Sequence, residues 1–156
     1  GGKEKEMIDK NGIEIKTGDV VEITGAYFKN DNGLYFVRRS AGDAGWCGNY
    51  HSLHKISKTG KISRASGASR SWPISIYTND YMKRIEGNAW NEEYATIEVK
   101  AGINQTYIAE HFRQAAEALD AQIEYEIYNY GEDSECTKLT KSVKSHFISV
   151  AERITV

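Results

Sequence analysis

The segment GDVVEITGAYFKNDNGLYFVRR, residues 18–39, most constrains how this chain can fold. In VVEIT, apolar and polar side chains alternate, and this period of two residues predicts a half-buried strand. The turn residues at positions 30–33 (NDNG) tolerate positive φ, which is typical of a hairpin. The β-forming residues of LYFVRR predict the returning strand. The segment is therefore an antiparallel hairpin whose second strand ends in Arg38 and Arg39.

More short strands are expected within the first 78 residues. YHSLHKISKTGKIS, residues 50–63, predicts a second hairpin with its turn at Lys58-Thr59-Gly60. WPISIYT, residues 72–78, predicts a further strand, and Pro73 suits its start or a sheet edge because proline has no N–H to donate. Five or so short strands with turns at close intervals favour a small barrel or a sandwich.

The sequence pattern changes after residue 78. NDYMKRIEGNAW predicts a short helix, and YATIEVK, residues 94–100, predicts a strand. Residues 104–122 predict the best helix of the chain, with one apolar stripe formed by Ile108, Phe112, Ala115, Ala116 and Leu119. IEYEIYNY, residues 123–130, predicts a strand, and residues 142–156 predict one or two more. The second half thus reads as a β-α-β unit with an added strand, its helix covering the sheet after a right-handed crossover.

The first hairpin resembles the KOW motif. The resemblance covers about 20 of the 156 residues and is carried by Gly18-Asp19, the alternating strand, Gly25, Lys29, Gly33 and Val37. It departs from the motif where the usual Lys-Gly pair is Lys29-Asn30. The KOW motif implies an SH3-like barrel that binds RNA or binds ribosomal and polymerase proteins. The whole chain also resembles small accessory proteins of phages and plasmids, some of which inhibit host defence.

The predicted fold class is α+β. Residues 1–9 are expected to be a flexible N-terminus, of which Gly1-Gly2 is interpreted as a tag remnant. Residues 10–78 are predicted to form an SH3-like β-barrel, and residues 79–156 an α+β unit packed on that barrel.

Charge is spread unevenly along the chain. The formal net charge is −2, yet residues 27–84 hold ten basic and three acidic side chains, net +7. Such asymmetry predicts a face that attracts polyanions, unless folding interleaves the segments. No apolar run reaches the roughly 20 residues of a membrane-spanning helix, and no signal peptide is visible. The two cysteines make no disulfide framework, so a cytoplasmic location is expected.

The basic segment is interleaved with aromatic residues, a combination typical of proteins that bind single-stranded nucleic acid. Alternation along LYFVR places Leu34 and Phe36 opposite Tyr35 and Val37. If Tyr35 and Val37 fill the core, Phe36 is left for the helix layer or for a ligand. The predicted nucleic-acid or partner-binding residues are Lys29, Phe36, Arg38, Arg39, Lys55, Lys58, Lys61, Arg64 and Arg70.

The sequence gives little support for a phosphate-binding loop, a metal site or a catalytic site. SKTGKIS lacks the glycine and the Ser/Thr that a phosphate-binding loop requires. Cys47, His51 and His54 lack the spacing of a structural zinc site, and nothing selects a nucleophile–histidine–acid set. Trp46 can either plug the barrel end or stack on a base. We therefore expect a non-enzymatic binding protein without a cofactor or metal, binding nucleic acid or, alternatively, a protein partner.

Overall fold

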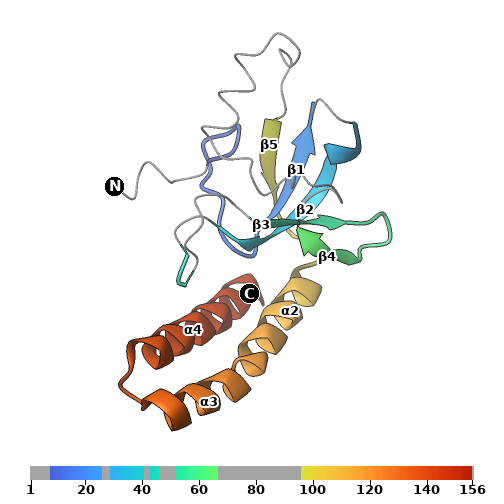
Figure 1. Ribbon diagram of the computed structural model, residues 1–156. Coiled ribbons are helices and arrows are strands. Elements are labelled where there is room, and N and C mark those ends of the chain that lie inside the picture. Colours follow the sequence, from blue (N-terminus) through green and yellow to red (C-terminus); the bar gives the residue numbers. More distant parts are fainter. Residues whose placement is uncertain (1–7, 26–28, 41–42, 46–51, 67–95, 156) are drawn as a thin grey trace. The chain divides into compact units, whose positions relative to one another are not determined.

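The computed structural model describes residues 8–25, 29–40, 43–45, 52–66 and 96–155. The chain is α+β, as predicted, and divides into two compact units, Gly1–Ile103 and Asn104–Val156. The described strands all belong to the first unit and the described α-helices to the second (Figure 1). Within these residues, no helix is long and apolar enough to cross a membrane.

A five-stranded antiparallel sheet forms the first unit. Its strands are β1 (Val20–Thr24), β2 (Gly33–Arg39), β3 (Ser52–Ile56), β4 (Ile62–Ser66) and β5 (Thr96–Lys100), in the order β4-β3-β2-β1-β5. Both predicted hairpins are confirmed, because β1 pairs with β2 and β3 pairs with β4. Each edge strand, β4 or β5, has one neighbour among the described strands, so these strands form an open sheet and no closed barrel.

Strand β5 corrects the predicted β-α-β unit. It pairs antiparallel with β1, so that Ile97 lies opposite Ile23 and Val99 opposite Val21. The predicted parallel pairing of residues 94–100 with residues 123–130 is therefore wrong. Strand β5 extends the N-terminal sheet by pairing with the free edge of β1. The secondary-structure elements described in the C-terminal unit are then all helices.

Strand β2 is the centre of the sheet and is covered on both faces. Val21, Tyr35 and Val37 on one face have no exposed surface, and the strand register places Val21 opposite Tyr35. Phe36 on the other face is equally buried and lies opposite Val20. The alternation of side chains along β2 correctly predicted one buried face. The structure shows that the second face is buried as well.

The segment before β1 is held in place by a buried carboxylate. Asp9 accepts hydrogen bonds from the backbone N–H groups of Ile13 (2.8 Å), Asn11 (2.9 Å) and Val99 (2.9 Å). Ile8 forms a β-bridge with Glu14. Residues 8 and 9, at the end of the segment expected to be a flexible N-terminus, take part in these contacts.

Three helices form the second unit: α2 (Gln105–Ala118), α3 (Asp120–Tyr130) and α4 (Glu135–Thr155). The predicted apolar stripe is confirmed in part: Ile108, Phe112 and Ala116 of α2 are buried, whereas Ala115 and Leu119 are half-buried. Its expected partner is wrong, however, because the stripe packs on α4 rather than on a crossover sheet. The rings of Phe112 and Phe147 lie 5.7 Å apart between their centroids.

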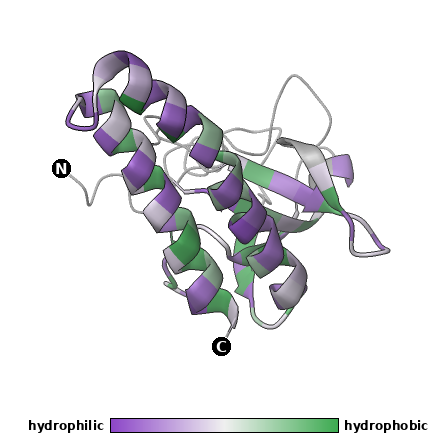
Figure 2. Cartoon of the chain, turned by 90° about the horizontal axis from the view of Figure 1, so that it is seen from below, coloured by the Kyte–Doolittle hydropathy of each residue, from purple (hydrophilic) through white to green (hydrophobic). Residues whose placement is uncertain are grey.

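Helices α3 and α4 replace the strands predicted for residues 123–130 and 142–156. Buried residues of α4 recur at helical spacing, as Val143, Phe147, Val150, Ala151 and Ile154. Figure 2 shows hydrophobic and hydrophilic residues alternating around these helices. In α3, Ile123 and Ile127 lie four residues apart, so the same letters satisfy a helix as well as a strand.

Several predictions fall outside the described residues. They are the strand at residues 72–78, the helix that begins at residue 79, and the placement of Trp46.

Candidate functional site

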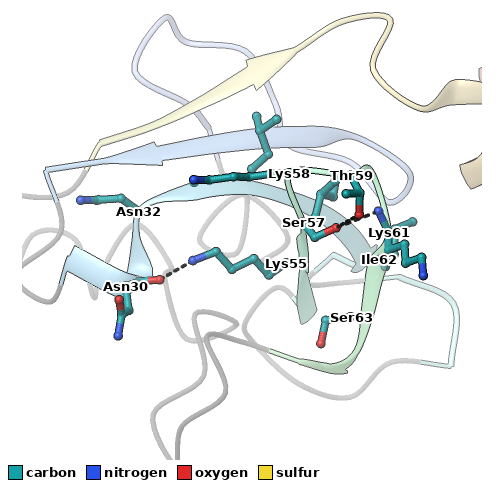
Figure 3. Close-up of a pocket in the computed structure, with 12 residues that line it drawn as sticks. Asn30, Asn32, Lys55, Ser57, Lys58, Thr59, Lys61, Ile62 and Ser63 are labelled. Atoms are coloured by element: carbon teal, nitrogen blue, oxygen red, sulfur yellow. Dashed lines mark hydrogen bonds between the residues drawn. The ribbon is translucent and has the colours of Figure 1, made fainter.

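An open groove of about 980 Å³ lies on the sheet unit, between the turn that precedes β2 and the β3–β4 hairpin. Figure 3 shows its lining residues. They are Asn30, Asn32, Gly33, Leu34, Lys55, Ile56, Ser57, Lys58, Thr59, Lys61, Ile62 and Ser63. The two sides of the groove come from segments that are distant in sequence and are brought together by the pairing of β2 with β3.

The charged residues among the described lining of the groove are all basic. Lys55, Lys58 and Lys61 line it, and no carboxylate is among the lining side chains that the structure describes. Amide and hydroxyl side chains supply hydrogen-bonding groups, while leucine and isoleucine side chains supply an apolar part. The groove can therefore attract an anion and hydrogen-bond it.

Lys55 is held in place across the groove. Its ammonium group donates a hydrogen bond to the backbone carbonyl of Asn30 and lies 5.7 Å from the centroid of the Tyr35 ring. Figure 3 shows this side chain reaching from β3 toward the Asn30 turn. Gly33 leaves room for this approach, because a Cβ at this position would lie only 3.2 Å from Lys55 Cε and would require the lysine to shift by a few tenths of an ångström. Gly33 also has φ +136°, which side-chain-bearing residues rarely adopt.

The β3–β4 loop is ordered by its own hydrogen bonds. The Ser57 N–H donates to the Lys61 carbonyl (2.8 Å), and the Lys61 N–H donates to Ser57 Oγ (3.1 Å). Ser57 Oγ also lies 3.0 Å from Thr59 Oγ1, and Gly60 adopts φ +88° at the turn. This network presents Lys58 and Lys61 from a defined loop, with both side chains exposed.

Lys29 lies at the same end of the sheet as the groove. It begins the 3-10 turn Lys29–Asp31, which precedes β2, and its side chain is exposed. Four of the predicted binding residues thus come from the two segments that flank the groove, although Lys29 is not one of its lining residues.

Arg38 and Arg39 are placed elsewhere. They lie at the other end of β2, roughly 20 Å from Gly33 at the usual rise per strand residue. An irregularity in the β2–β3 pairing occurs between Val37 and Arg39. Burial, together with the charge of Arg39, lowers the pKa of Arg38 to about 10. Arg39 donates to the carbonyl of Ala44 at 3.3 Å. The structure therefore places Arg38 and Arg39 at the end of β2 opposite to the groove that Lys55, Lys58 and Lys61 line.

Phe36 is not the exposed aromatic platform that was proposed for it. It has no exposed surface, and its ring lies 5.8 Å from the ring of His54 on the neighbouring strand. Residues on both faces of β2 are buried, and the alternation argument could not reveal burial of the second face. A buried ring cannot stack on a base, and Phe36 is withdrawn from the binding set.

His54 is also part of this packed region. Its Nδ1 lies 2.9 Å from the Ser63 carbonyl, which can only accept, so Nδ1 carries the proton and Nε2 accepts from Ser52 Oγ at 3.3 Å. Burial lowers the pKa of His54, the Ser63 carbonyl opposes this change, and the charge of Arg38 adds to it. These contacts favour a neutral imidazole that binds its neighbours within the sheet.

The remaining predicted binding residues are Arg64 and Arg70. Arg64 belongs to β4, but its side chain lies outside the described part of the chain. Arg70 lies wholly outside the described residues. The sequence analysis missed the polar residues Asn30, Asn32, Ser57, Thr59 and Ser63, which line the groove beside the lysines. In the sequence, their position in two turns was the feature that could have drawn attention to them. Only the pairing of β2 with β3 shows that these two turns line one groove.

No group of three or more metal-ligating side chains occurs in the described ranges. Cys47 and His51, considered for zinc, lie outside those ranges. Comparisons with protein-family models, with curated proteins and with solved structures find no match. Functional inference therefore rests on the geometry and charge of the chain itself.

Proposed function

We propose that this protein binds nucleic acid, without catalysis, by holding the phosphate backbone in the lysine-lined groove. The observation that carries the proposal is that Lys55, Lys58 and Lys61 line one groove, with no carboxylate among its described lining side chains. Each lysine that neutralises a phosphate releases condensed counterions, and this release supplies affinity without regard to sequence.

The other lining groups suit the same ligand. Asparagine and serine side chains can hydrogen-bond phosphate and sugar oxygens or base edges, as polar side chains do in nucleic-acid interfaces. The two aromatic side chains at the centre of β2, Tyr35 and Phe36, are fully buried. We therefore assign binding to backbone contacts rather than to base stacking.

We also propose that the sheet unit is SH3-like and that its first hairpin is a KOW-like motif. Strands β1 to β4 follow one another as neighbours, and β5 returns to the free edge of β1, which is the order expected of a small SH3-like barrel. Gly18, Gly25 and Gly33, which carry the KOW resemblance, all have positive φ, at 93°, 72° and 136°. Backbone conformations that favour glycine at all three positions support the resemblance.

Salt dependence tests the proposal directly. Binding of the intact protein to fluorescently labelled, mixed-sequence single-stranded RNA and DNA would be followed by anisotropy. If three to four lysines contact phosphates, raising salt from about 50 to 200 mM should weaken binding roughly 20- to 50-fold at the single-strand slope. Substituting Lys58→Gln together with Lys61→Gln should lower the slope of log K against log salt by about 1.4.

A matched charge change serves as the control. Lys138→Gln together with Lys141→Gln removes two lysines from α4, outside the groove, and should leave the slope unchanged. Equal effects of the groove and control substitutions would point to general charge attraction and contradict the proposed site. Absence of binding to both RNA and DNA at low salt, with folded protein at micromolar concentration, would contradict nucleic-acid binding altogether.

A further inference from the structure

Helix α3 buries a charged residue and exposes its aromatic ones. Within this helix, Glu126 is the one buried residue, and its Oε2 accepts a hydrogen bond from Gln122 Nε2 at 3.2 Å. Tyr125, Tyr128 and Tyr130 are 60%, 89% and 60% exposed. Large aromatic side chains gain most from burial, so a helix that leaves three of them in solvent is expected to have a partner surface.

We call the three exposed rings together the tyrosine face, in which Tyr125 adjoins each of the other two. Tyr125 and Tyr128 lie three residues apart and share one side of the helix. The rings of Tyr125 and Tyr130 lie 6.4 Å apart between centroids in an edge-to-face arrangement. At about 150–250 Å² for a fully buried aromatic residue, the exposed fractions correspond to roughly 300–500 Å².

The charge beside this face is negative. Glu124 lies four residues before Tyr128 on the same side of the helix, and Asp133 lies in the turn that follows α3. Asp120 pairs with Lys144, and Glu132 pairs with Lys141 at 3.1 Å. No ion pair joins Glu124 or Asp133 to another of the described residues. The Glu124 carboxylate thus stays available on the side of the helix that carries Tyr128, and the Asp133 carboxylate follows in the turn after the helix.

We propose that the tyrosine face binds a short, arginine-bearing basic segment of a partner protein. A guanidinium group stacks on tyrosine rings and also forms paired hydrogen bonds with a carboxylate, so one arginine can use both features of the face. A lysine offers a point charge and no planar group, which makes arginine the better fit.

Two observations argue against a second copy of this chain as the occupant. A two-fold interface places the same patch on both sides, so it would bring Glu124 and its copy onto one acidic interface. The exposed tyrosine area is also well below the roughly 800 Å² that each partner contributes to a standard interface. A short extended segment needs less area and supplies the opposite charge.

The test uses the intact protein and a fluorescently labelled peptide that alternates arginine and glycine. Binding by anisotropy is expected at low salt, and an equally long lysine–glycine peptide should bind several-fold more weakly. Tyr128→Ser and Glu124→Gln should each weaken binding of the arginine peptide roughly 3- to 10-fold. The matched control is Tyr107→Ser, which removes a 53% exposed tyrosine from α2, outside the tyrosine face, and should change affinity less than about twofold.

Circular dichroism of each variant checks that the helices are retained. Equal loss for Tyr128→Ser and Tyr107→Ser, equal affinity for the two peptides, or no binding at millimolar peptide would each overturn the proposal. A concentration-dependent dimer that Tyr128→Ser dissociates would also overturn it, in favour of a second copy as the occupant. This surface belongs to α3, so these outcomes leave the test of the lysine-lined groove unaffected.

Discussion

At the scale of single residues, Asp9 shows how backbone donors can stabilise a buried charge. Burial by itself opposes ionisation of this carboxylate. The N–H groups of Val99, Ile13 and Asn11 more than offset that effect and hold the pKa of Asp9 below its ordinary value. One of these donors belongs to β5, so the carboxylate connects the N-terminal segment to an edge strand that is distant in sequence.

We expect Asp9→Asn to destabilise the fold by about 1–3 kcal/mol at neutral pH, because an amide cannot accept all three hydrogen bonds. The pKa of Asp9 is lower in the folded than in the unfolded chain. Its contribution is therefore complete above the unfolded pKa and is lost as pH falls through the folded pKa. Urea unfolding at pH 7 and near pH 3 should show the difference from the wild-type protein shrinking at the lower pH.

An exposed carboxylate provides the comparison for Asp9. Asp133→Asn, in the turn after α3, should change the free energy of unfolding by less than about 0.5 kcal/mol. A similar effect for the two substitutions, or a difference at Asp9 that does not depend on pH, would show that its carboxylate does not anchor the segment.

At the scale of elements, local pattern was sufficient for some segments and ambiguous for others. The hairpin turns contain glycines with positive φ, at Gly33 and Gly60, and these were recognisable from the letters alone. The α4 sequence also carries helical spacing and a start signal, because Ser134 Oγ accepts from the Thr137 N–H at 3.3 Å as an N-cap residue does. Strands were predicted for residues 142–156, and packing on α2 stabilises the helix instead.

The contact between α2 and α4 is the element-scale interaction most open to test. Phe112 has no exposed surface and contacts Phe147, so Phe112→Ala should cost about 3–5 kcal/mol in the free energy of unfolding. Chemical denaturation followed by circular dichroism measures it. On the same helix, Tyr107→Ala should cost less than about 1 kcal/mol because Tyr107 is 53% exposed. A small loss at Phe112 would contradict the helical core.

At the scale of the whole molecule, the chain separates charge between its two units. The lysine-lined groove lies on the first unit, whereas residues 104–156 hold nine acidic and five basic side chains, net −4. The proposed nucleic-acid site and the proposed site for a basic peptide therefore lie on units of different charge. The overall charge of −2 conceals this division.

The division into units predicts that residues 104–156 can form helices without the sheet. Phe112 and Phe147 contact each other within this unit, and Arg113 bridges α2 to Thr155 of α4 at 2.8 Å. A fragment of these residues should show a helical circular dichroism spectrum and a cooperative thermal transition, though with low stability for so short a chain. A random-coil spectrum would show that this unit depends on the first.

The sequence by itself determined the α+β class, the two N-terminal hairpins, the apolar stripe of α2 and the basic character of residues 27–84. These features depend on side-chain periodicity and turn chemistry, which act over a few residues. Tertiary structure decided which strands are neighbours, and hence that Lys55, Lys58 and Lys61 share a groove while Arg38 and Arg39 do not. It also decided that Phe36 is buried and that α3 is a helix. Burial and strand pairing depend on contacts between segments distant in sequence, and no local pattern records those contacts.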